Sequence, residues 1–187
     1  MNMTKKEALL IIDIQNDYFP AGAYPLTNPE TAAKNAKLLI EKFRSDGKNI
    51  IHIQHISTQV DAGFLLPGTE GANIHEEVAP IPSEKIIIKH SPNSFHETDL
   101  LDHLEKEQIT DLVVCGMMTQ ICVDSSVRAA KDYAFNVTLI SDACATLDLE
   151  FQGQKISAEH VQLSFISALQ FFYADVTTTN QFLRQSI

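Results

Sequence analysis

The sequence predicts an α/β protein built on a doubly wound, mainly parallel sheet of six strands, similar to a Rossmann fold. Two observations support this prediction: short apolar runs alternate with segments of helical periodicity, and no linker, repeat or low-complexity tract interrupts them. Strands that alternate with helices form right-handed βαβ units in a parallel sheet. A chain of 187 residues is long enough for one sizeable core and short for two, so we expect a single domain over residues 1–187.

The first third of the chain predicts two strands, a helix and a long loop. Segment 8–14 is apolar on both faces, which is typical of a parallel strand covered on both sides. Apolar residues recur near helical spacing over 28–44, and Pro29 suits a first helical turn. A second strand follows at 49–56. The stretch 57–82 is rich in Gly and Pro, so we expect an irregular loop that helps to form a pocket.

The rest of the chain repeats the alternation of strand and helix. Apolar runs predict strands at 85–89, 111–116, 136–143 and 174–179. Helical patterns lie between them, at 97–107, 120–133 and 158–172. In a sheet of this type, ligands bind beyond the carboxyl ends of the strands, where the strand order reverses.

Three polar residues follow from that rule, because each lies at or just after the end of a predicted strand: Asp13, Lys89 and Cys122. Thr119 is a candidate N-cap, which would place Cys122 in a first helical turn, where the helix dipole favours a thiolate. Taken alone, a cysteine is more often a packed thiol, and we expect that of Cys115 and Cys144.

The other two residues each allow two interpretations. Lys89 closes an apolar strand, so it is either solvated at the sheet edge or turned inward, where an ammonium lowers the pKa of a nearby thiol. Asp13 interrupts an apolar strand, and a buried carboxylate needs a partner. An ion pair with Lys89 would satisfy it, and near a thiol the same carboxylate could accept a proton.

The segments around these residues resemble the isochorismatase-like cysteine hydrolases, the superfamily of nicotinamidase and N-carbamoylsarcosine amidohydrolase. The matching segments are LLIIDIQNDYF, IIIKHSPNSF, VCGMMTQICVDSSVRAA and SDACAT, which lie in the family's order over nearly the whole chain. The resemblance implies a triad of Asp13, Lys89 and Cys122 whose thiolate attacks an amide carbonyl and forms a thioester that water then hydrolyses. It also implies an oxyanion hole of the Met118 and Cys122 backbone N–H groups, and a cis peptide bond between Met117 and Met118.

The metal-binding nicotinamidases of this superfamily carry an Asp-x-His pair after the second strand, and this chain departs from that pattern. Here the segment reads QHISTQ, with His55 but no Asp-x-His. His52 and His55 are three residues apart on a predicted strand, so their side chains point to opposite faces. His75, in the loop, could approach His55. We expect no metal and no cofactor.

The substrate contacts are predicted from residues near the same strand ends. The chain has no Trp, so the aromatic residue that helps to hold pyridine rings in some nicotinamidases is missing. We expect an apolar wall of Tyr18, Phe95 and Met117. The predicted polar contacts are Gln15, Asn93 and Gln120.

Charge and composition limit the partners. Fourteen Lys and Arg against 24 Asp and Glu give a net charge of −10, which argues against nucleic acid and anionic membranes. No apolar run is long enough to span a membrane, and an odd number of cysteines without a secretory signal predicts reduced thiols in the cytoplasm. The resemblance implies a homodimer or homotetramer, with an interface near residues 169–173.

Three functions remain open. The first is a cysteine hydrolase that cleaves a C–N bond in a small amide, imide or carbamoyl compound. The second is vinyl-ether hydrolysis of the isochorismatase type, which this superfamily performs without a cysteine nucleophile. The third is a non-catalytic binding domain on the same fold.

Overall fold

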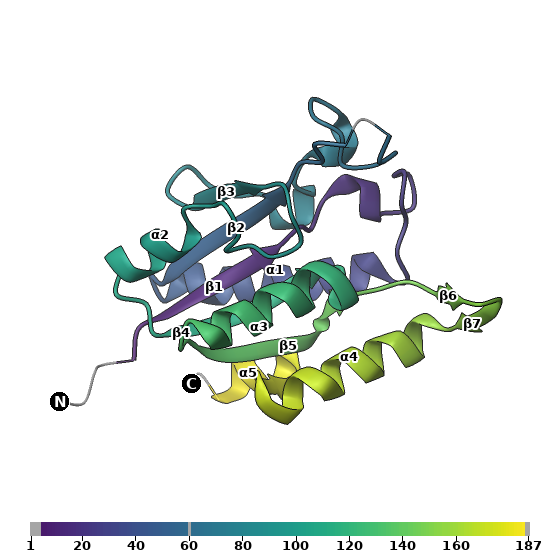
Figure 1. The fold of residues 1–187 in the computed structure, drawn as a ribbon. Coiled ribbons are helices and arrows are strands. Elements are labelled where there is room, and N and C mark those ends of the chain that lie inside the picture. Colours follow the sequence, from purple (N-terminus) through teal and green to yellow (C-terminus); the bar gives the residue numbers. More distant parts are fainter. Residues whose placement is uncertain (1–4, 60, 186–187) are drawn as a thin grey trace.

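The computed structural model describes residues 5–59 and 61–185. Its centre is a six-stranded sheet in which every neighbouring pair is parallel (Figure 1). The strand order is β3-β2-β1-β4-β5-β8, so the order reverses between β1 and β4. The strands are β1 Glu7–Ile12, β2 Asn49–His55, β3 Lys85–Lys89, β4 Asp111–Met117, β5 Asn136–Ala145 and β8 Asp175–Thr177. The predicted α/β class and parallel six-stranded sheet are confirmed.

Helices cover both faces of this sheet (Figure 1). One core cluster joins the sheet to α1 and α5, and a second joins its other face to α2, α3 and α4. The helices are α1 Pro29–Ser45, α2 Leu100–Lys106, α3 Asp124–Asp132, α4 Ala158–Phe172 and α5 Thr179–Gln185. Strands feeding helices on alternate faces make the sheet doubly wound.

The central strand β1 shows why the sheet needs helices on both faces. Leu9 and Ile11 pack into the first cluster, whereas Leu10 and Ile12 pack into the second. Alternate side chains of a strand point to opposite faces, so a fully apolar strand is stable only with both faces covered. Burying each of these side chains stabilises the fold by roughly 1.5–3 kcal/mol relative to leaving it in water.

The edge strand β3 is covered on one face only. Ile86 and Ile88 are 43% and 54% exposed, whereas Ile87 and Lys89 are buried. The period of two in a strand therefore turns the Lys89 side chain to the same side as the buried Ile87. This alternation decides between the two interpretations of Lys89 in favour of the inward one.

Two segments were missed by the sequence prediction. The first is a hairpin of β6 Leu149–Phe151 and β7 Gln154–Ile156, joined by two residues of positive φ, Gln152 and Gly153. Both central φ angles are positive in a type I′ turn, which favours glycine at the second position. The second is α5, which begins at Thr179, the last residue of the predicted strand 174–179. The 57–82 loop is irregular as expected, apart from two short 3₁₀ turns, Glu70–Ala72 and Glu76–Val78.

Two local expectations are corrected. A π-helical turn, Thr119–Val123, precedes α3, and Thr119 Oγ1 donates to the Ala145 carbonyl at 3.1 Å instead of capping it. In α4, Leu169 is fully buried, so the exposed apolar residues at that end are Phe171 and Phe172. In the described part of the chain, no helix is both long and apolar enough to cross a membrane.

Candidate active site

The carboxyl ends of β1, β3 and β4 bring the three predicted residues together. Asp13 directly follows β1, Lys89 is the last residue of β3, and Cys122 lies in the π-turn that follows β4. Donor atoms of Asp13 and Cys122 lie within 4.8 Å of one another. The cluster therefore lies beside the point where the strand order reverses between β1 and β4, as the rule for open α/β sheets predicts.

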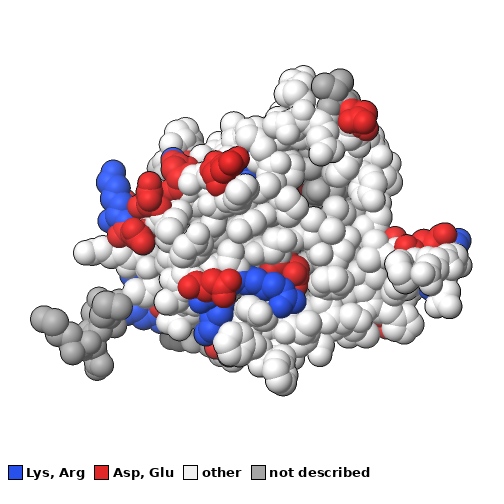
Figure 2. Space-filling view, in the orientation of Figure 1, with Lys and Arg blue, Asp and Glu red and all other residues white. Residues whose placement is uncertain are grey.

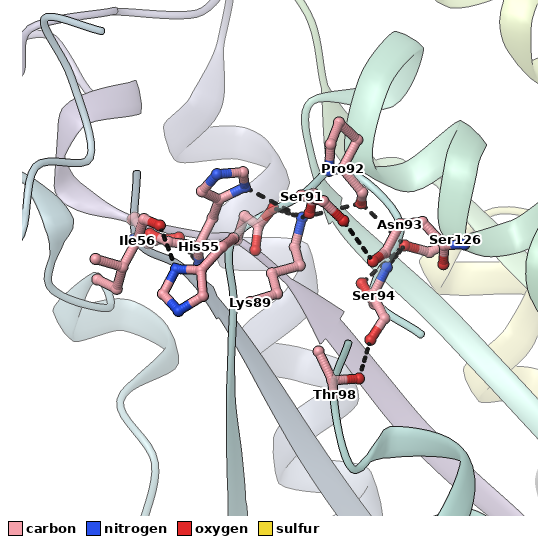
Figure 3. Close-up of polar contacts among 12 residues, drawn as sticks. His55, Ile56, Lys89, Ser91, Pro92, Asn93, Ser94, Thr98 and Ser126 are labelled. Carbon is pink, nitrogen blue, oxygen red and sulfur yellow. Dashed lines mark hydrogen bonds and ion pairs between the residues drawn. The ribbon is translucent and has the colours of Figure 1, made fainter. Parts of the chain in front are cut away.

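A buried ion pair forms the base of the cluster. Lys89 Nζ lies 2.8 Å from Asp13 Oδ2, and both side chains are fully buried. The ammonium also donates to the carbonyls of Ser91 and Pro92 at 3.0 Å each, and lies 3.3 Å from His55 Nδ1 (Figure 3). Burial by itself would lower the pKa of Lys89, but Asp13 and Cys122 outweigh it and raise the pKa. Lys89 is therefore a charged ammonium surrounded by acceptors.

The Asp13 carboxylate retains an unused oxygen. Its backbone adopts φ 50°, in the left-handed region that Asp tolerates better than most residues, and its N–H donates to the Ile53 carbonyl at 3.1 Å. Neither carboxylate oxygen receives a hydrogen bond from the described residues, and only Oδ2 lies in the ion pair with Lys89. Buried polar atoms normally have a partner, so an oxygen without one is an available proton acceptor.

Cys122 is buried at the base of a cavity, and its resting state differs from the expected thiolate. Burial raises the pKa of the Cys122 thiol well above its usual value, and the Asp13 carboxylate raises it further. Lys89 lowers the pKa, but less, because its charge is shared with Asp13. The dipole of a five-residue π-turn does not offset this loss of solvation. The expectation of a resting thiolate is therefore wrong, and Cys122 is a thiol beside a carboxylate.

The other two cysteines are packed thiols, as expected. Cys115 is fully buried in β4, where burial raises its thiol pKa. Burial also raises the pKa of Cys144 to about 12. Neither has an acid or a cation placed as Asp13 and Lys89 are placed around Cys122.

The cavity above Cys122 has a volume of about 260 Å³. The loop after β2 forms one wall, as the sequence predicted. Its apolar lining consists of Tyr18, Ala62, Phe64, Leu65, Pro92, Met118 and Ile121. Its polar lining, besides Cys122, consists of His55, Ser57, Thr58, Gln59 and His90. None of the described lining residues is Asp, Glu, Lys or Arg.

Of the six predicted substrate contacts, the structure brings only Tyr18 to this cavity. Burial, followed by the nearby Asp13 and Cys122, raises the pKa of Tyr18, so its phenol is neutral. Gln15 serves the fold instead. Its side chain accepts from the His55 backbone N–H at 2.8 Å and donates to the His55 and Ala72 carbonyls at 2.9 and 2.7 Å. It therefore holds the end of β2 and the following loop in place.

The remaining four residues are corrected in the same way. Phe95 packs with Phe135 in the core, and Met117 is fully buried in β4. Asn93 accepts from the Phe95 backbone N–H at 2.9 Å, and Gln120 accepts from the Thr146 hydroxyl at 2.6 Å. Packing and local hydrogen bonds occupy these side chains away from the cavity. The peptide bond between Met117 and Met118 is cis, and Met118 lines the cavity.

His55 is a functional candidate that the sequence analysis considered only as a metal ligand. It ends β2, between the strands that carry Asp13 and Lys89, and its side chain lines the cavity. Burial, then Lys89, lowers the pKa of His55 despite the opposing effect of Asp13, so the imidazole is neutral. Its place at a strand end on the same edge was the signal that could have identified it.

A metal ion does not fit this cluster. Asp13, His55 and Cys122 offer donor atoms within 4.8 Å of one another. The Lys89 ammonium, however, lies against both Asp13 and His55, so its positive charge opposes a cation there. The two other histidines considered as ligands have different partners: His52 pairs with Glu84 at 2.9 Å, and His75 stacks on Phe19.

Comparison with known proteins agrees with this fold. The family model for the isochorismatase domain matches residues 7–181. The uncharacterised isochorismatase family protein YddQ of Bacillus subtilis is 49% identical over 177 residues, covering 95% of this chain and 98% of that protein. Nicotinamidase 3 of Arabidopsis thaliana is 27% identical over 153 residues, covering 79% of this chain and 77% of that protein.

Solved structures show the same relationship. The crystal structure of an isochorismatase from Pseudomonas putida KT2440 superposes with a TM-score of 0.89 at 31% identity, over 97% of this chain and 93% of that one. Sequence and fold therefore agree over almost the whole length. The chain belongs to the isochorismatase family of hydrolases.

Proposed function

We propose that the protein hydrolyses a C–N bond of a small amide, imide or carbamoyl compound through a thioester on Cys122. One observation carries the proposal: a cavity ends on a thiol that lies beside a buried carboxylate with an unused oxygen. Nucleophile, base and the group that orients the base are the parts that covalent acyl transfer requires. The similarity to a nicotinamidase supports an amide as the substrate.

The reaction begins with a proton transfer, because the resting nucleophile is a thiol. As Cys122 Sγ attacks the carbonyl carbon, its proton passes to Asp13, and the C–N bond then breaks. Asp13 returns the proton to the departing nitrogen, which leaves as ammonia or an amine. A water molecule then attacks the thioester, giving one proton to Asp13, and the thiol is restored as the carboxylic acid departs.

Lys89 pairs with the Asp13 carboxylate and holds it beside the thiol. An ammonium 2.8 Å away lowers the free energy of the carboxylate, and its hydrogen bonds to two carbonyls hold it in position. The backbone N–H groups of Met118 and Cys122 are the proposed oxyanion hole, since both residues line the cavity where the carbonyl oxygen would lie. Losing one such donor typically costs about 100- to 1000-fold in turnover.

The two alternatives use less of what the site contains. Vinyl-ether hydrolysis has no role for the Cys122 thiol. A binding domain has no need of a buried Asp13–Lys89 pair, which is costly to desolvate and is a weak source of stability.

The test is an ammonia-release screen over small amides, imides and carbamoyl compounds at pH 8, with the Cys122→Ala protein as the blank. We expect wild-type turnover to fall at least about 1000-fold in Cys122→Ala and in Asp13→Asn, while Cys144→Ala remains active. Addition of a chelator should not change the rate. Ammonia release that persists in Cys122→Ala would exclude the thioester route.

A further inference from the structure

We propose that this site accepts only substrates that are uncharged near the scissile bond, and that it rejects those carrying a carboxylate there. This inference deepens the proposed function and rests on the same cavity. It is carried by the charge and the hydrogen-bond capacity of the groups that a substrate would meet.

The only cation of the triad has no capacity to bind a carboxylate. An ammonium has three N–H donors. Lys89 Nζ lies at hydrogen-bond distance from the carbonyls of Ser91 and Pro92 and from His55 Nδ1 (Figure 3). Asp13 Oδ2 lies 2.8 Å from the same ammonium in the ion pair. Every donor is therefore already used, and Lys89 is fully buried beneath the cavity.

The walls of the cavity provide no substitute. Among the described lining residues there is no Lys or Arg, and the larger contacts are the apolar Tyr18, Phe64, Leu65 and Ile121. A carboxylate moved from water into such surroundings loses its solvation without gaining a partner. Figure 2 shows one face of the molecule, where charged side chains gather mainly over α2, α3 and the β6–β7 hairpin, with uncharged surface between them.

The two imidazoles do not change this balance. His55 is neutral, as described above, and its Nδ1 faces the ammonium. His90 is exposed and donates from Nδ1 to the Ile56 carbonyl at 2.8 Å. The proton that leaves Cys122 passes to Asp13, so Asp13, Lys89 and Cys122 together stay at zero net charge and offer an anionic substrate no attraction.

The size of the cavity points to a compact substrate. Its volume of about 260 Å³ lies just below the range of roughly 300–1,000 Å³ that is typical of small-molecule sites. The apolar wall of Phe64, Leu65 and Ile121 favours a hydrocarbon or aromatic substituent on the acyl group. The substrate class is therefore a small, neutral amide with an apolar substituent.

Two alkylating reagents test the charge rule without knowledge of the substrate. Iodoacetamide and iodoacetate have nearly the same size and differ in one group, a neutral amide or a carboxylate. The rate of modification of Cys122 by each is measured at pH 8 by peptide mass spectrometry, and glutathione gives the intrinsic ratio of the two reagents. We expect the ratio of iodoacetamide to iodoacetate rates to be at least tenfold higher at Cys122 than for glutathione.

A matched pair of variants places the cause in the cavity. Ile121 lines the cavity and is 40% exposed, so it tolerates a longer polar side chain. Ile121→Arg supplies a guanidinium that can pair with a carboxylate, and should lower the ratio at least fivefold. Ile121→Gln adds polarity without charge and should leave the ratio within twofold of wild type.

The outcomes separate this inference from the proposed function. A ratio at Cys122 equal to or below that of glutathione overturns the inference, as does a failure of both reagents to modify Cys122. An equal effect of Ile121→Arg and Ile121→Gln also overturns it. The proposed function is judged separately, by ammonia release in wild type against Cys122→Ala, so either can fail while the other stands.

Discussion

The buried pair of Asp13 and Lys89 makes a quantitative prediction about stability. Replacing Lys89 with Met keeps most of the side-chain volume but leaves the Asp13 carboxylate, which is fully buried, without its cation. Breaking such a pair from one side typically costs about 3–5 kcal/mol, because an uncompensated charge remains in the interior. The carbonyls of Ser91 and Pro92 also lose their donor. We therefore expect Lys89→Met to lie at the upper end of that range.

Asp13→Asn should cost less. The ammonium then still has the Ser91 and Pro92 carbonyls and His55 Nδ1 as acceptors, so we expect a loss of about 3 kcal/mol, the lower end of the range. The double variant removes both charges and should be more stable than Lys89→Met alone. Contacting residues of this kind show coupling energies of about 0.5–3 kcal/mol.

Urea unfolding at pH 7.5 measures these free energies, followed by far-UV circular dichroism because the chain has no Trp. Cys122→Ser serves as a control that alters the site and leaves the ion pair intact. The reasoning is refuted if Lys89→Met loses less than about 1 kcal/mol, or if the double variant loses the sum of the two single losses.

Three further predictions concern the supports of the site. Gly116 has φ +138°, and a Cβ at this position would meet a carbonyl oxygen of β1. We therefore expect Gly116→Ala to lower the free energy of unfolding by more than the roughly 1–3 kcal/mol of backbone strain alone. Gly47→Ala, at a position with positive φ and open space, is the control in the thermal-unfolding measurement. Gln15→Leu removes both side-chain hydrogen bonds to the main chain at the end of β2, so we expect about 2–4 kcal/mol and slower alkylation of the catalytic thiol. Gln54→Leu, which loses one bond, should cost less in the same urea titration. Burial lowers the pKa of the His52 imidazole below 6.5, despite its hydrogen bond to a carboxylate. The contribution of the neutral imidazole to stability is therefore complete above pH 6.5, and it is lost as the pH falls through the folded-state pKa. The free energy of unfolding should therefore decrease between pH 7.5 and 5, and an unchanged slope in His52→Asn would contradict this assignment.

The three candidate triad residues could be chosen from sequence because each is a polar residue where an apolar strand ends. Parallel strands place such ends at one edge of the sheet, however far apart they lie in the chain. The direction of Lys89 could not be chosen in this way. In the run KIIIK, Ile86 and Ile88 lie on one face of the strand, and Ile87 lies on the other face together with Lys89. The sequence does not indicate which of these faces is buried, and only the exposure of Ile86 and Ile88 shows which face of β3 meets the core.

The substrate contacts were the least predictable part. Phe95 and Met117 have the composition of a pocket wall, but neighbouring side chains in the core enclose them. Gln15 has the chemistry of a ligand contact, but its side-chain amide is hydrogen-bonded to the main chain of His55, at the end of β2, and of Ala72, in the following loop. Residues such as Phe64 and Leu65 reach the cavity because a loop of low periodicity folds over it, and such a loop carries no pattern from which contacts can be read.

The sequence by itself determined the α/β class, the order of the elements and the edge of the sheet at which the chemistry lies, because periodicity and strand ends are local properties of the chain. Only the tertiary structure decided that Cys122 rests as a thiol, that Lys89 is saturated by its hydrogen-bond acceptors and the Asp13 carboxylate, and that the cavity has no charged wall among its described residues. The physical reason is that solvation and charge pairing depend on what surrounds a group in space. For these buried groups, those surroundings come from segments that are distant in the sequence.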